Sequence, residues 1–310
     1  EFASCAEHTA MLRDKGFAVT EAVAGIPTAV MGEAGEGGPV IAILGEYDAL
    51  PGLSQEAGVD YPKPVEEGGA GHGCGHNLLG SAALLAACAL KDWLAETGTP
   101  GRVRYYGCPA EEGGAAKSFM VRDGAFDDVD AAICWHPSGM TRVDEAQSLA
   151  NTRMDFAFTG RASHAAAAPH LGRSALDAAE LMNVGVQYLR EHIPQESRIH
   201  NAYLEAGGTA PNVVQARTVT RYAIRSTTLS GMRSLNERVQ DIARGAALMT
   251  GTRVDISIMS AVSNMQGNTP LEEAMQQAMD SLGGVPFDDA DRDYAARIQA
   301  TLSDEDINAE

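Results

Sequence analysis

The first half of the chain alternates short apolar runs with one longer apolar stretch. Residues 40–44 form a continuous apolar run, which is typical of a strand covered on both faces. Residues 81–94 carry small and apolar side chains over most of a helical surface, and further short strands are expected at 102–107 and 131–135. This alternation predicts an α/β fold with a mostly parallel sheet.

The pattern changes near residue 150. Residues 152–159 alternate between apolar and polar side chains, as in a half-exposed strand. Ser174 and Ser234 have the chemistry of helix N-caps. Three more strands are expected at 198–205, 218–227 and 253–259. The resulting βαββαβ order is the ferredoxin-like arrangement, so residues 151–259 are predicted to form a small domain inserted into a larger one, residues 1–150 plus 260–310.

Composition argues against two classes of partner. The formal charge is −19, which repels phosphate backbones, so we expect no nucleic-acid partner. No continuous apolar run approaches the ~20 residues that span a bilayer, so we expect no membrane partner. The first residues lack the regions of a signal peptide, and the five cysteines form no C-x-x-C pair. These features predict a cytoplasmic protein without a disulfide framework.

Polar side chains with metal-binding or proton-transfer chemistry follow several predicted elements. They occur in residues 45–51, 71–77 and 108–114, and at His136. In open α/β sheets, ligands bind outside the carboxyl ends of the strands. Taken singly, each cluster is more often an ordinary turn, surface loop or core histidine. Taken together, the four clusters predict one site in a single crevice.

Cys74 and His76 are the most specific pair. Thiolate and imidazole suit zinc or a similar cation, and the intervening glycine lets both side chains face one ion. A redox or nucleophilic cysteine is the alternative, but no resolving cysteine or triad pattern accompanies it. A purely structural zinc site, closed and tetrahedral, is a further alternative.

The adjacent carboxylates of Glu111 and Glu112 suit two separate tasks. One can bind a metal ion while its neighbour takes a proton from a water molecule, a general-base role. His136 can supply a further imidazole. Asp48 can orient a ligand imidazole by accepting a hydrogen bond from the ring nitrogen that does not bind the metal. Equally ordinary explanations are a solvated loop for the glutamates and turn chemistry for Asp48 before Pro51.

Seven stretches carry a resemblance to a known family. They are GEYDALPGLSQ (45–55), GHGCGHNLLG (71–80), YYGCPAEEGG (105–114), FMVRDGAFDDVDAAICWHP (119–137), SHAAAAPHLGRSALDA (163–178), GGTAPNVVQA (207–216) and RIQATL (297–302). Over essentially its whole length the chain resembles the M20 metallopeptidase family, in its aminoacylase-like amidohydrolase branch. Together these stretches form a specific signature.

The resemblance implies a role for each candidate residue. The ligands of two divalent ions, Mn²⁺ or Zn²⁺, would be Cys74, His76, Glu112 and His136, with Glu111 as the catalytic base. His164 would bind substrate or stabilise the oxyanion, in one version across a dimer. Asn212 and Arg225 would contact the substrate carboxylate, although Arg225 is as readily explained as a strand surface residue.

The resemblance also implies an activity. The expected reaction is cleavage of the amide bond of a small N-acyl amino acid, such as p-aminobenzoyl-glutamate or a related aminoacyl or dipeptide substrate. The inserted domain would be the lid and dimerisation domain of a homodimer, or of a heterodimer with a related chain. The catalytic domain would continue past residue 310 to a last histidine ligand. The alternative is a non-catalytic, metal-binding partner subunit.

Overall fold

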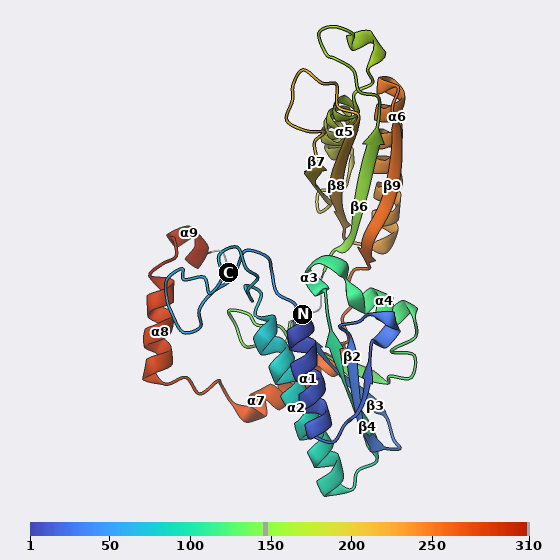
Figure 1. Ribbon diagram of the computed structural model, residues 1–310. Helices are drawn as coiled ribbons and strands as arrows, with labels where there is room; N and C mark the ends of the chain where they lie inside the picture. Colours follow the sequence, from blue (N-terminus) through green and yellow to red (C-terminus); the bar gives the residue numbers. More distant parts are fainter. Residues whose placement is uncertain (145–147, 309–310) are drawn as a thin grey trace. The chain divides into compact units, whose positions relative to one another are not determined.

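The computed structural model describes residues 1–144 and 148–308, and these fold as two compact units (Figure 1). One unit contains Glu1–Val143 together with the chain from Glu273 onward, and the other runs from Asp144 to Glu272. Each unit has its own sheet and its own hydrophobic core.

The first unit is built on a five-stranded sheet of order β1-β2-β4-β3-β5. Its strands are β1 (Ala18–Glu21), β2 (Val30–Glu36), β3 (Val40–Glu46), β4 (Gly101–Cys108) and β5 (Ala131–Ile133). Strand β3 is parallel to β4 and β5, whereas β2 is antiparallel to β1 and β4. The sheet is therefore mixed, and the prediction of a mostly parallel sheet is wrong on the β1–β2 side. Glycine and glutamate interrupt the apolar pattern of β2, so the pattern did not mark it as a strand.

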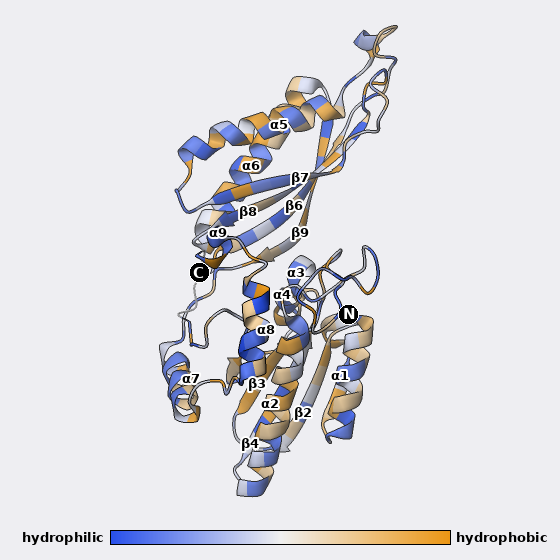
Figure 2. Ribbon diagram, turned by 90° about the vertical axis from the view of Figure 1, so that its left-hand side faces the viewer, coloured by the Kyte–Doolittle hydropathy of each residue, from blue (hydrophilic) through white to orange (hydrophobic). Residues whose placement is uncertain are grey.

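Two long helices cover this sheet, and the remaining helices of the unit are short or peripheral. In chain order the helices are α1 (Phe2–Asp14), η1 (Val23–Gly25), α2 (His76–Thr97), α3 (Glu111–Gly114), α4 (Ala116–Arg122), α7 (Thr269–Leu282), α8 (Asp289–Gln299) and α9 (Asp304–Ile307). The first four residues of α7 belong to the other unit. Leu12 of α1 and Ala83 and Ala87 of α2 are buried in one core cluster with Val103 and Tyr105 of β4. Strand β3, whose sequence is VIAILGE, is mostly apolar, and it is drawn largely in orange in Figure 2.

Helix α2 begins at His76, earlier than the sequence pattern predicted, and it packs closely on β3. A Cβ atom at Gly80 would lie 2.5 Å from the carbonyl oxygen of Glu46, so only glycine allows this approach. Among the described helices, α2 alone is long and apolar enough to cross a membrane, although no continuous apolar run in the sequence indicated this. Its buried face, which includes Leu79 and Ala83, packs within the core of the unit.

The second unit has the predicted βαββαβ order. Its elements are β6 (Ala150–Thr159), η2 (Pro169–Leu171), α5 (Ala175–Leu189), η3 (Arg190–His192), β7 (Arg198–Glu205), β8 (Arg217–Ser226), α6 (Leu229–Thr250) and β9 (Arg253–Val262). The antiparallel sheet has the order β7-β8-β6-β9, and its core side packs against α5 and α6. Ser174 caps α5 as predicted, but α6 is capped by Thr228, so Ser234 lies inside that helix.

Candidate metal centre

Four segments of the first unit bring their polar side chains together. They are the end of β3 with the residues after it, the loop into α2, the short helix α3, and the residue stretch after β5. Because β3, β4 and β5 are parallel, their carboxyl ends lie at the same edge of the sheet. Ala110 and Ala115, which flank α3, both have left-handed backbone, a strained conformation for alanine that is enriched at functional sites.

Asp48 organises the buried side of the cluster. His76 is fully buried, and its Nδ1 lies 2.8 Å from Asp48 Oδ1. The other carboxylate oxygen, Oδ2, accepts a hydrogen bond of 3.0 Å from the backbone N–H of Glu112. Since a carboxylate only accepts, the neutral form of the His76 ring carries its proton at Nδ1, and its Nε2 lone pair is directed away from Asp48.

Two groups of potential ligand atoms share His76. In the first, atoms of Cys74, His76 and His136 lie within 4.8 Å of one another, and Cys74 Sγ is 3.3 Å from His136 Nε2. In the second, atoms of Glu46, His76 and Glu111 lie within the same distance. The structure thus brings the predicted residues Asp48, Cys74, His76, Glu111, Glu112 and His136 into one cluster.

Glu46 and Lys117 belong to this cluster and were missed by the sequence interpretation. Glu46 Oε2 is 3.2 Å from His76 Nε2, and Lys117 Nζ contacts Glu46 Oε1. A signal for Glu46 did exist: it stands two residues before Asp48, and residues at that spacing in an extended chain point to the same side. Lys117, 71 positions away from Glu46, gave no such signal.

The surroundings raise the pKa of two central groups. Desolvation and then the charge of Glu46 raise the pKa of Glu111, although this side chain is still partly exposed to solvent. Desolvation, and then a hydrogen bond with Glu112, raise the pKa of Cys74 to about 11. Nucleophilic cysteines have a lowered pKa, so this environment argues against the redox or nucleophilic alternative. A raised carboxyl pKa suits a group that exchanges protons near neutral pH.

The residues fit a divalent cation. His76 Nε2 is buried and makes no hydrogen bond, and it faces the carboxylate of Glu46, which is also an acceptor. Two acceptors at this distance repel each other unless a cation joins them. A cysteine that loses its proton on metal binding, two imidazoles and several carboxylates form a donor set that borderline divalent ions accept.

The candidate residues of the second unit lie at two ends of its sheet. Arg225 pairs with Asn151 at one end of the β6–β8 ladder, and Arg217 pairs with Thr159 at the other. Beyond Arg217 the backbone N–H of Ala165 donates to the carbonyl of Asn212, which places His164 beside Asn212. Arg217 and Arg225 are eight positions apart on β8. At ~3.3 Å per residue, about 26 Å of strand separates the Arg217 end from Arg225.

His164 has a fixed orientation. Its Nδ1 accepts hydrogen bonds from the backbone N–H groups of Ala166 and Ala167, at 3.2 and 3.1 Å. Because Nδ1 accepts, the neutral ring carries its proton at Nε2, which leaves Nε2–H as a donor.

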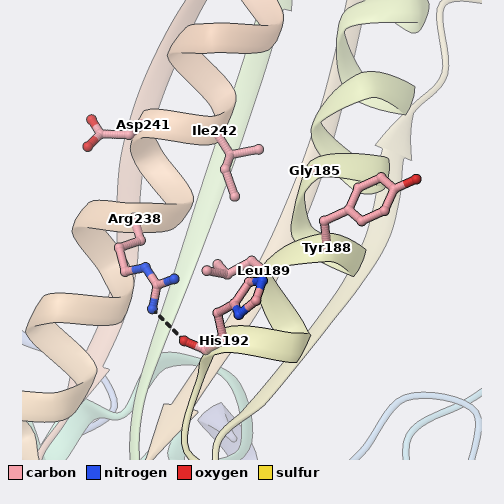
Figure 3. Close-up of a pocket in the computed structure, with 7 residues that line it drawn as sticks. All are labelled: Gly185, Tyr188, Leu189, His192, Arg238, Asp241 and Ile242. Carbon is pink, nitrogen blue, oxygen red and sulfur yellow. Dashed lines mark hydrogen bonds between the residues drawn. The ribbon is translucent and has the colours of Figure 1, made fainter.

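A separate hollow of about 370 Å³ lies between α5 and α6 (Figure 3). Arg238 donates to the carbonyl of His192 at its edge, at 2.9 Å. None of the sequence-predicted site residues lines it.

Fold and site together define an α/β protein that has a cluster of potential metal ligands and carries an inserted βαββαβ unit. The model of Peptidase family M20/M25/M40 matches residues 42–296, and the chain belongs to this family.

Curated relatives support this membership. The chain is 50% identical over 302 residues to one subunit of the p-aminobenzoyl-glutamate hydrolase of Escherichia coli, covering 97% of this chain and 63% of that protein. It is 33% identical to the Xaa-Arg dipeptidase of Mus musculus, covering 75% of this chain and 52% of that protein. The chain thus spans less than two thirds of the length of these relatives.

Solved structures share the fold. An aminobenzoyl-glutamate utilization protein from Klebsiella pneumoniae matches with a TM-score of 0.69 at 21% identity, covering 97% of this chain and 83% of that one. A dinuclear metal-binding peptidase of the M20 family from Bacillus subtilis matches with a TM-score of 0.62 at 20% identity, covering 91% and 74%.

Proposed function

We propose that this chain is the metal-binding, catalytic part of an amidohydrolase that cleaves a small N-acyl amino acid. The observation that carries the proposal is the convergence of Cys74, His76, His136 and Glu112 with Glu111 beside them. The names of the relatives make p-aminobenzoyl-glutamate the first substrate to test, ahead of other aminoacyl compounds and dipeptides.

Cys74, His76, Glu112 and His136 would hold two divalent ions, for which we propose Mn²⁺ or Zn²⁺. Such ions polarise an amide carbonyl and lower the pKa of water to ~7 when bound. Asp48 keeps the His76 ring in the tautomer that offers Nε2 to the cluster.

Glu111 would act as the general base and then as the acid. Its carboxylate takes a proton from water while the water oxygen bonds to the carbonyl carbon. As the carbon–nitrogen bond breaks, Glu111 returns this proton to the leaving amine. The raised pKa of Glu111 supports this use, because a carboxyl group with an ordinary pKa holds a proton poorly near pH 7.

We further propose that the inserted unit, with His164, Asn212 and Arg225, serves as lid and dimerisation domain. The Nε2–H of His164 would donate to the oxyanion, and Asn212 and Arg225 would bind the substrate carboxylate. A small substrate does not span the ~26 Å between the two ends of the sheet. One site would therefore combine Arg225 of one chain with His164 and Asn212 of another, in a homodimer or with a related chain.

A non-catalytic role within a larger assembly is the second candidate. Two proteins of Escherichia coli that are named as different subunits of p-aminobenzoyl-glutamate hydrolase both match this chain, at 50% and 30% identity. A hydrolase with two related chains leaves room for one of them to bind metal without turnover. For the compartment we propose the cytoplasm, in keeping with five free cysteines.

Release of p-aminobenzoate from p-aminobenzoyl-glutamate, with Mn²⁺ or Zn²⁺ added, tests the proposal. Glu111→Gln should lower kcat by roughly 10²–10⁴-fold, because it removes the base without changing the shape. Glu56→Gln, in a surface ion pair with Lys63, is the matched control and should keep full activity. Turnover that survives Glu111→Gln would rule out the mechanism, and metal binding without any turnover would favour the non-catalytic role.

A further inference from the structure

Glu46 stands in an arrangement that the proposed ligand set does not explain. Its Oε2 atom lies 3.2 Å from His76 Nε2, and its side chain is only 15% exposed. In the neutral His76 ring, Asp48 holds the proton at Nδ1, so Nε2 presents a lone pair toward Glu46. The Nε2 atom is buried and makes no hydrogen bond. A lone pair and a carboxylate facing each other inside the protein form a place for a cation.

Lys117 approaches the same carboxylate from the other side. Its Nζ contacts Glu46 Oε1, so the two oxygens of Glu46 have different neighbours: Oε1 faces the ammonium and Oε2 faces the His76 lone pair. Lys117 lies in α4, directly after the α3 helix that carries Glu111 and Glu112. Its fixed charge thus partly neutralises a carboxylate at the edge of the cluster.

We propose that Glu46 is a further metal-facing carboxylate of this centre and that Lys117 is its competing counter-ion. Glu46 would complete the group of potential ligands that it forms with His76 and Glu111. Lys117 reduces the charge that Glu46 offers and so weakens the attraction for a divalent ion. This inference rests on the proposed metal centre but not on turnover.

The two residues therefore act with opposite signs on metal affinity. In equilibrium dialysis with Mn²⁺ alone, Glu46→Gln should weaken binding of one ion by roughly 10–100-fold, the size of effect seen when a carboxylate near a metal is lost. Lys117→Met should tighten binding by about threefold to tenfold, because Glu46 then keeps its full charge. Lys117→Arg keeps the charge and should bind as the unaltered protein does.

Two control variants test whether losing any ion pair changes Mn²⁺ affinity. Glu33→Gln breaks the ion pair with Arg104 in the same sheet, and Lys91→Met breaks the surface pair with Asp92. Both should leave Mn²⁺ affinity unchanged. Circular dichroism checks folding, and Lys117→Met keeps the inference testable if Glu46→Gln unfolds, since it removes no ligand.

Unchanged Mn²⁺ affinity in Glu46→Gln would overturn the inference, and would assign Glu46 to an ion pair with a doubly protonated His76. Weaker binding in Lys117→Met would also overturn it. An unaltered protein that binds no Mn²⁺ would instead refute the metal centre, and so the proposed function itself.

Discussion

At the scale of single residues, the candidate metal centre depends on the contacts that the two carboxylate oxygens of Asp48 make. One fixes the His76 ring and the other holds the backbone of Glu112, so a single carboxylate links two of the four proposed ligands. Residue types and spacing were enough to predict Asp48, Cys74 and His76 as a group. They were not enough for Glu46 and Lys117, because that contact joins distant segments through side-chain geometry alone.

Asp48→Asn should weaken Mn²⁺ binding by roughly 10–100-fold. Asparagine offers one oxygen, so it can accept a hydrogen bond from His76 or from the Glu112 N–H but not from both. Equilibrium dialysis measures the change. Asp60→Asn, in an ion pair with Arg297, is the control, and equal affinities for the two variants would contradict the role of Asp48.

His164 should populate the Nε2–H tautomer, because two backbone N–H groups donate to its Nδ1. Nitrogen-15 NMR of labelled protein distinguishes the two ring nitrogens of a neutral histidine. A predominant Nδ1–H form would refute the proposed donor to the oxyanion.

At the scale of elements, the close contact between α2 and β3 positions the cluster. The sequence predicted both elements from their apolar content, but it placed the start of α2 after the site residues. The glycine-rich stretch at 71–77 predicted a loop before the helix, whereas the helix extends back to His76, and His76 and Leu79 are already on its buried face. The β1–β2 pair was missed because β1 has only four residues and β2 is rich in glycine and glutamate.

Gly80→Ala should destabilise the protein by about 1–3 kcal/mol, because the new methyl group collides with the Glu46 carbonyl. It should also weaken metal binding by displacing His76 from Glu46. Gly245→Ala in α6 has open space around it and should stabilise the protein by up to ~1 kcal/mol. Urea unfolding compares the two, and equal stabilities would contradict the packing described.

The Arg104–Asp128 pair ties β4 to the segment before β5, and it should give stability a pH dependence. Hydrogen bonds from Arg104 lower the pKa of Asp128 below its ordinary 3.8. The stabilisation is therefore fully present above pH 3.8 and is lost as the pH falls through the lower pKa of the folded state. Asp128→Asn should unfold more easily than the unaltered protein at pH 7 in urea, with the difference shrinking below pH 3.8. A difference that stays constant with pH would contradict this.

At the scale of the whole molecule, the chain consists of two compact units, each with its own sheet and hydrophobic core. The sequence predicted the βαββαβ order of the inserted unit, because apolar residues recur at regular spacing along its strands and helices. Sequence could not place Arg225 and His164 at opposite ends of one sheet, since that depends on strand register. Because Arg225 and His164 of one chain are too far apart to contact one small substrate, the proposed site needs one of them from a second chain.

Mixing two inactive variants tests that requirement. Arg225→Ala and His164→Ala should each lose most activity alone. After their chains exchange, about a quarter of the sites should be intact, because about half the dimers are mixed and each has one complete site. Activity that does not return would contradict a site shared between identical chains.

The most direct test of the metal centre is anomalous scattering from a crystal soaked with Mn²⁺. We predict two peaks ~3.5–4 Å apart, bounded by Cys74, His76, Glu112 and His136, with Glu46 on the His76 side. A single ion in a closed tetrahedral shell, or no ion among these residues, would contradict the proposal.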